Sequence, residues 1–167
     1  MARLYPLALL IPVVLVISGC RSPHVELSER QKQITNESAA ATDDYLAQKI
    51  GGAGFGGRVF CAHEVLDVEG SGESVKEYVF AVCQEYGLRG GSLREGTGVA
   101  MPVALQLEGR DQKYQVISHQ TPGDSPRYEG DVKRMFPEKT HPEIINGDRK
   151  GLLAAVEQKA KSYYGLQ

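Results

Sequence analysis

Three residues in the middle of the chain are of types that could do chemistry together: Cys61, His63 and Cys83. Thiolates and imidazoles are ligands that zinc prefers, and a thiol beside a histidine can serve as a nucleophile with its base. The same two cysteines could instead be joined to each other in a disulfide. Which of these holds depends on how the strands that carry them are paired.

The segments around these residues have the composition of a β-hairpin. Residues 58–67 and 75–86 are rich in Val, Phe and Tyr, and residues 69–74 between them contain the Gly and Ser that are typical of a turn. With the turn centred on Gly72, Cys61 lies opposite Cys83. The same register gives three further pairs: Phe60 with Gln84, Ala62 with Val82, and Leu66 with Tyr78.

We expect Cys61 and Cys83 to form a disulfide. Opposed residues in a non-hydrogen-bonded antiparallel pair have Cα atoms about 4.5 Å apart, a separation that a disulfide can bridge. His63 lies on the same strand face as Cys61, so a metal or thiol site made of Cys61, His63 and Cys83 is the alternative. His119 could supply a fourth ligand only if the last strand lies alongside.

The third cysteine, Cys20, follows a segment with the features of a signal peptide in the usual order. Arg3 precedes an apolar run over residues 4–17, which contains two prolines. This run is shorter than the ~18 residues that a membrane-spanning helix requires. The small residues Ser18 and Gly19 then give a peptidase access to the backbone.

The tetrapeptide Ile17-Ser18-Gly19-Cys20 resembles the lipobox of bacterial lipoproteins. The resemblance covers the first 20 residues only. It implies that the chain is cut before Cys20, whose thiol then carries a diacylglycerol, and that the protein is held on a lipid bilayer in the cell envelope. By the same resemblance, Arg21 instead of Asp after the cysteine favours the periplasmic side of the outer membrane in a Gram-negative cell. Lipidation of Cys20 would leave Cys61 and Cys83 as an even pair in an oxidising compartment.

The chain is thus expected to comprise a signal peptide (1–19), a polar tether (20–40) and a single globular domain (41–167). The tether would be a coil with a reach of roughly 25–30 Å. We expect a short helix to start at Thr42 and to stop at Gly51-Gly52. A net charge of −2 at pH 7 gives no electrostatic footprint for nucleic acid, so no such partner is expected.

Two glycine-rich segments follow. Gly52, Gly54 and Gly57 match the G-x-G-x-x-G pattern, but a helix precedes the motif and a strand follows it, which is the reverse of the order in dinucleotide-binding folds. We therefore expect a connector. Residues 87–98 are expected to form a long surface loop, whose Arg89 and Arg94 could cradle an anion.

The remaining chain predicts a second hairpin and three helices. Its strands cover 99–107 and 113–119, with Leu107 opposite Tyr114, Leu105 opposite Val116 and the turn at Arg110-Asp111. The helices are expected to begin near Ser125, Thr140 and Asp148. The predicted fold is therefore α+β: a four-stranded antiparallel sheet of two hairpins, with a short N-terminal helix and the C-terminal helices packed on one face.

The sequence contains no complete catalytic set, and no cofactor is expected. The favoured hypothesis is a membrane-anchored envelope protein that binds a partner, with no catalysis. The alternative is a metal-binding or thiol-dependent envelope protein that uses Cys61, His63 and Cys83. A small hydrolase with Glu64, His119 and Asp124 is a third hypothesis, which their spacing does not specifically support.

Overall fold

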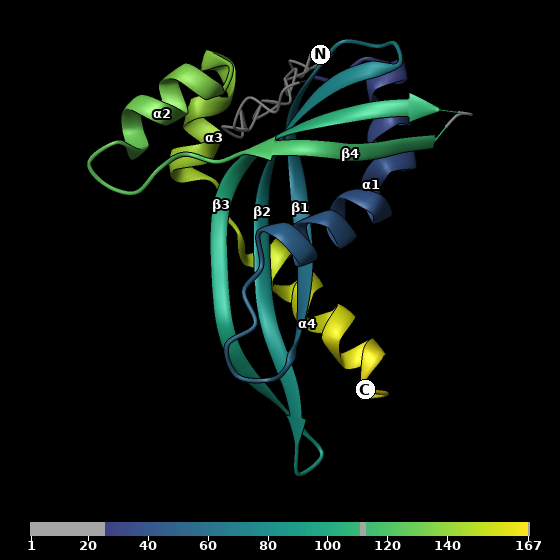
Figure 1. The fold of residues 1–167 in the computed structure, drawn as a ribbon, viewed down its shortest axis with the longest axis vertical. Coiled ribbons are helices and arrows are strands. Elements are labelled where there is room, and N and C mark those ends of the chain that lie inside the picture. Colours follow the sequence, from purple (N-terminus) through teal and green to yellow (C-terminus); the bar gives the residue numbers. More distant parts are fainter. Residues whose placement is uncertain (1–25, 111–112, 167) are drawn as a thin grey trace, which may run out of the picture.

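The computed structural model describes residues 26–110 and 113–166, so Cys20 and the signal-like segment lie outside the described residues. Its four strands form one antiparallel sheet in chain order (Figure 1). They are β1 (Arg58–Glu69), β2 (Ser74–Arg89), β3 (Ser92–Arg110) and β4 (Lys113–Gln120). The helices are α1 (Glu29–Lys49), α2 (Tyr128–Met135), the 3-10 helix η1 (Glu138–Thr140), α3 (His141–Asn146) and α4 (Lys150–Tyr163). The α+β fold with helices against a four-stranded sheet is confirmed.

Helix α1 is far longer than predicted. It begins at Glu29 and has an N-terminal capping box. The Ser28 hydroxyl accepts a hydrogen bond from Gln31 N, and the Gln31 side chain accepts one from Ser28 N. The prediction of a polar tether is therefore wrong for residues 29–40. The buried side of α1 repeats every fourth residue, as expected for one helix face. Its members are Ile34, Ser38, Thr42 and Leu46.

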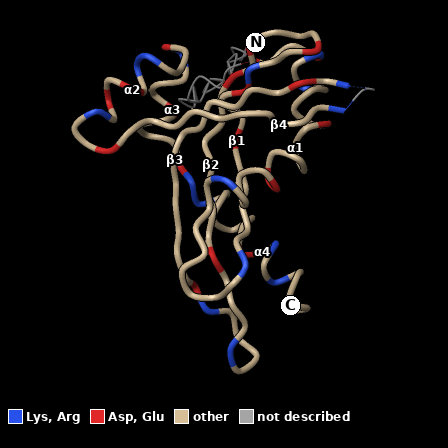
Figure 2. The backbone as a smooth tube through the Cα atoms, viewed as in Figure 1, with Lys and Arg blue, Asp and Glu red and all other residues tan. Residues whose placement is uncertain are grey.

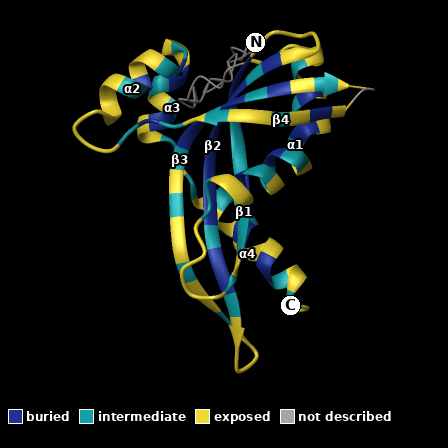
Figure 3. Cartoon of the chain, in the orientation of Figure 1, coloured by how far each residue is buried: buried dark blue, intermediate teal, exposed yellow. Residues whose placement is uncertain are grey.

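Helices cover both faces of the sheet, and the prediction of a single covered face is wrong. On one face, Ile34 and Leu46 of α1 pack against a cluster that includes Val79 and Val103. On the other face, the C-terminal helices contribute Val132, Phe136, Ile144, Val156 and Ala160 to a second cluster. Strand β2 runs between the two clusters and is buried along most of its length (Figure 3). Among the described residues, no helix has the length and apolar character needed to cross a membrane.

The register of β1 and β2 agrees with the prediction around the cysteines. Cys61 lies opposite Cys83, and Phe60 and Ala62 lie opposite Gln84 and Val82. A β-bulge between Val65 and Asp67 then shifts the pairing by one residue, so Tyr78 lies opposite Asp67 and not opposite Leu66 as predicted. The cysteine pairing depends on this bulge. If the register next to the turn continued without the extra residue, Cys61 would lie opposite Gln84.

The predicted loop over residues 87–98 is wrong. Strand β2 continues to Arg89 and β3 begins at Ser92, so this segment is the end of a long hairpin. Gly90 and Gly91 form its two-residue turn, with φ angles of 59° and 77°. Two consecutive residues with positive φ match the twist of the flanking strands, and glycine adopts that conformation without strain.

The pairing of β3 with β4 is displaced from the prediction by two residues. Leu107 lies opposite Val116 and Gly109 lies opposite Tyr114, with a register shift between Gln106 and Leu107. Tyr114 takes this place because Gly109 has no side chain: a Cβ there would lie 3.0 Å from Tyr114 Cε1. The predicted turn at Arg110-Asp111 falls partly on residues 111–112, which lie outside the described residues.

The C-terminal helices begin close to the predicted positions. Helix α2 starts at Tyr128 after Arg127, a few residues later than the predicted cap at Ser125. Thr140 precedes α3, but its hydroxyl donates to Pro137 O and makes no capping bond to α3. The predicted cap Asp148 does accept a hydrogen bond from Lys150 N, at 3.0 Å, at the start of α4.

Candidate functional site

The structure contains the Cys61–Cys83 disulfide, with the two Cα atoms 4.1 Å apart. The sulfur atoms are bonded to each other, so neither cysteine offers a thiolate to a metal or to a substrate. Among the described residues, no three His, Cys, Asp or Glu side chains are placed to hold a metal ion. His119 lies on β4, and its Nδ1 is 2.9 Å from Tyr45 Oη on α1. The alternative metal or thiol site is therefore not what the structure shows.

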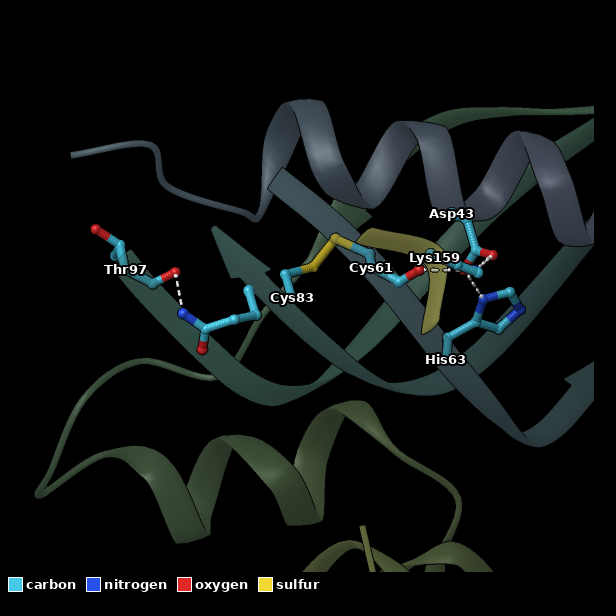
Figure 4. The surroundings of a disulfide bond; sticks show 7 residues. Asp43, Cys61, His63, Cys83, Thr97 and Lys159 are labelled. Atoms are coloured by element: carbon cyan, nitrogen blue, oxygen red, sulfur yellow. Dashed lines mark hydrogen bonds and ion pairs between the residues drawn. A yellow bond between two sulfur atoms is a disulfide. The ribbon is translucent and has the colours of Figure 1, made fainter. Parts of the chain in front are cut away.

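His63 belongs to a polar network that joins three elements (Figure 4). Its Nδ1 lies 2.7 Å from Asp43 Oδ1 on α1. Lys159 of α4 forms an ion pair with the other oxygen of Asp43 and donates a hydrogen bond to Cys61 O at 2.8 Å. Burial alone would raise the pKa of Asp43, but the hydrogen bonds from His63 and Lys159 outweigh it and lower the pKa. These contacts tie α1, β1 and α4 together beside the disulfide.

Glu77 is a second polar residue under α1, and nothing in the sequence pattern marked it as buried. Its side chain is fully buried on the α1 side of β2, where Thr42 Oγ1 lies 3.4 Å from Oε2. Its other oxygen, Oε1, has no hydrogen-bond partner among the described residues. Burial raises the pKa of Glu77 to about 7, although His63 and Thr42 act in the opposite direction.

The glycine-rich segment before β1 encloses the carboxylate of Glu85. Backbone N–H groups donate to this carboxylate from Gly54 at 2.9 Å, Phe55 at 3.0 Å, Gly57 at 2.6 Å and Thr97 at 3.1 Å. Burial alone would raise the pKa of Glu85, but these four donors hold it at about 2. The G-x-G-x-x-G segment is therefore an anion cradle that the chain fills with its own carboxylate. This pairing supports the expectation of a connector.

A groove of about 860 Å³ runs along the free edge of β1 between α1 and α4. This volume lies within the roughly 300–1,000 Å³ range of ligand sites. Residues 57–61 line it from β1 and the position before it, and Lys159 and Tyr163 line it from α4. From α1 it is lined by Ala40, Asp43, Asp44, Ala47 and Gln48. Figure 2 marks acidic positions in the C-terminal half of α1 and basic positions in α4.

The three residues of the hydrolase hypothesis are not brought together as a set. Glu64 accepts a hydrogen bond from Arg149 Nη1 at 2.5 Å, and that guanidinium lies over the Phe80 ring on the side of the C-terminal helices. His119 is bonded to Tyr45 on the α1 side. The sheet therefore separates Glu64 from His119.

Comparisons with protein-family models, with curated proteins and with solved structures found no match to this chain. The functional conclusion therefore rests on the residues described above. Sequence reasoning missed the groove because it lies between α1 and α4 at the edge of β1, whereas both helices were expected on one face of the sheet. The one available signal was Lys159, a basic residue placed among the apolar positions of α4.

Proposed function

We propose that this chain is a lipid-anchored protein of the bacterial cell envelope whose folded domain is a binding module without catalysis. The observation that carries the proposal is the Cys61–Cys83 disulfide. Disulfides persist in oxidising compartments such as the periplasm and are rare in the cytosol. Since the sequence has three cysteines, the disulfide leaves Cys20 as the one available for lipid.

The start of α1 at Glu29 limits how far the domain can stand from the membrane. Residues 21–28 would join the lipid at Cys20 to the helix, and a chain of that length reaches at most roughly 30 Å. Two or three acyl chains would hold this end firmly, since a single chain binds membranes only marginally. The groove is lined by the C-terminal half of α1, the half farther from the anchor. This distance from the anchor along α1 supports a partner on the periplasmic side.

The polar groups near the groove favour binding over catalysis. His63, Asp43 and Lys159 are engaged with one another, and Glu85 is enclosed by backbone N–H groups. These contacts fix helices and strands in place, and each group already has a partner within the chain. A rigid groove supported in this way is suited to hold a ligand whose chemistry does not change.

The proposal is tested by the intact mass of the protein purified from the membrane fraction, before and after thiol alkylation. We expect the mass of lipidated residues 20–167, with Cys61 and Cys83 unreactive until they are reduced. A Cys20→Ala variant is the matched control and should lack the added lipid mass. A retained signal segment, an unlipidated Cys20 or freely reactive thiols would each refute the proposal.

A further inference from the structure

The edge of β1 offers backbone groups to a partner. The Cα separation of 4.1 Å between Cys61 and Cys83 is that of a non-hydrogen-bonded pair, in which both residues turn their N–H and C=O groups away from each other. The bond from Lys159 Nζ to Cys61 O agrees, because this carbonyl points out from the sheet. Val59 lies two residues earlier, so its N–H and C=O point the same way. Within residues 26–110 and 113–166, Val59 has no partner on that side.

The two walls of the groove differ in chemistry. In a strand added to β1, the side chains opposite Val59 and Cys61 would face α1, and the side chain opposite Phe60 would face α4. The α1 wall presents the exposed carboxylate of Asp44. The α4 wall presents the Tyr163 ring, which is 57% exposed, lies 5.5 Å from the Phe60 ring and has the Arg58 guanidinium over it at 4.6 Å.

The contact of Lys159 with Asp43 limits the length of the segment that can bind along β1. It crosses the edge of β1 at the carbonyl oxygen of Cys61, and the groove ends there along β1, so the open stretch spans Gly57 to Cys61. A second copy of the chain would fit poorly, because its own α1 and α4 flank its β1 and would meet the helices of the first copy. A short extended segment has no such obstruction.

We propose that this groove binds an extended polypeptide segment as an antiparallel fifth strand on β1, with basic side chains toward Asp44 and apolar side chains toward Tyr163. Main-chain hydrogen bonds to Val59 and Cys61 N–H would hold the segment, and the alternating side chains would provide specificity. This inference rests on the proposed role as a binding module and is independent of the lipid anchor.

The first test titrates the full chain, purified in detergent, with the blocked peptide Lys-Val-Lys-Val-Lys. Amide NMR signals report on both partners. We expect the amide signals of Val59 and Cys61 to shift and their hydrogen exchange to slow at least tenfold at saturation. The peptide Glu-Val-Glu-Val-Glu should bind at least tenfold more weakly. Equal binding of the two peptides, or unchanged exchange at Val59 and Cys61, would overturn the proposal.

Backbone methylation separates strand addition from simple charge attraction. In the proposed pairing, the N–H groups of the lysines face β1 and those of the valines face solvent. N-methylation of the central lysine should therefore abolish binding, whereas N-methylation of one valine should leave it within about threefold. Equal affinities for the two methylated peptides would contradict strand addition.

A charge reversal tests the α1 wall. Asp44→Lys should weaken binding of the lysine peptide at least tenfold. Glu37→Lys makes the same charge change on the exposed side of α1 outside the groove and should have little effect. Equal losses in the two variants would refute the assignment of Asp44.

Light scattering that shows a dimer, with the amides of Val59 and Cys61 already protected from hydrogen exchange, would assign the groove to a second copy of the chain. A correct intact mass with no peptide binding would refute the groove and leave the anchored protein standing.

Discussion

The ammonium group of Lys159 lies 2.8 Å from the carbonyl oxygen of Cys61, so a side chain of α4 occupies the free edge of the sheet. An edge strand with unpaired backbone groups is a template for pairing with other chains, and proteins commonly block such edges with lysine. Here the block is local: it covers the edge at Cys61 and leaves the groove open from there back to Gly57.

Replacing Lys159 with methionine should therefore weaken the fold and expose the edge. We expect a loss of about 1 kcal/mol in the free energy of unfolding, because the Asp43 carboxylate loses an ion-pair partner in a half-buried place. Urea denaturation measures this loss, and light scattering measures any new self-association. Lys161→Met is the control, since Lys161 pairs with Glu157 on the surface of α4. A control loss as large as that of Lys159→Met would argue against a special role for the edge contact.

Removal of the disulfide gives a second prediction. Cys61 and Cys83 are separated by 22 positions in the chain. Closing a loop of this size lowers the conformational entropy of the unfolded chain, so a Cys61→Ala, Cys83→Ala variant should lose about 3 kcal/mol of unfolding free energy. Urea denaturation with and without reductant measures it. Reductant should destabilise the natural protein and leave the variant unchanged; an effect on both would contradict this assignment.

The buried carboxyl group of Glu77 should make the protein less stable as the pH rises. Its pKa is raised from 4.5 to about 7, so between these values the folded state holds a proton that the unfolded state has released. Stability from this group is therefore full below about pH 4.5 and is lost by about pH 7. The difference corresponds to about 3 kcal/mol. A Glu77→Gln variant should lack this loss.

Urea denaturation at pH values from 4 to 8 tests the role of Glu77. The natural protein should lose stability relative to Glu77→Gln across this range. Glu37→Gln, on the exposed side of α1, is the control and should follow the natural protein. Parallel curves for Glu77→Gln and the natural protein would show that Glu77 does not titrate in this window.

Glu85 should behave in the opposite sense. The backbone donors lower its pKa from 4.5 to about 2, so its contribution is present above about pH 4.5 and is lost as the pH falls toward 2. Glu85→Gln removes the negative charge and places an amide group against N–H donors. We expect a lower Tm at pH 7 and faster hydrogen exchange at Gly54 and Gly57. Glu95→Gln, an exposed residue on β3, should change neither quantity. Unchanged exchange in Glu85→Gln would refute the cradle.

The strands could be predicted from the sequence, but which faces of the sheet are covered by helices could not, for a physical reason. The cysteine pairing was predicted correctly, but the turn alone does not set it: the pairs next to the turn are one residue out of the predicted register, and the bulge between Val65 and Asp67 brings Cys61 opposite Cys83. The α1 side of β1 and β2 carries His63, Glu77 and Glu85, which together are typical of a solvated face. Burial of these residues depends on partners from distant elements, such as Asp43 and the N–H groups of the glycine segment, and a local pattern cannot reveal such partners.

Helix α1 escaped prediction for a related reason. Its buried side is only half apolar, since the hydroxyl residues Ser38 and Thr42 lie between Ile34 and Leu46. Periodic apolar residues are the main sequence signal of a helix that packs on a core, and here half of that signal is missing. The hydroxyl groups fit because they bond nearby: Ser38 donates to Thr35 O and Thr42 donates to Glu77.

The packing of the first half of α1 provides the last prediction. Ile34 is fully buried against the sheet, so Ile34→Ala should lower the free energy of unfolding by about 3 kcal/mol through lost burial and a new cavity. Asn36→Ala, on the exposed side of the same turn, should change it by less than about 0.5 kcal/mol. Urea denaturation of both variants measures the difference. If residues 29–40 were a free tether, both substitutions would be neutral, and that result would show that the domain begins after them.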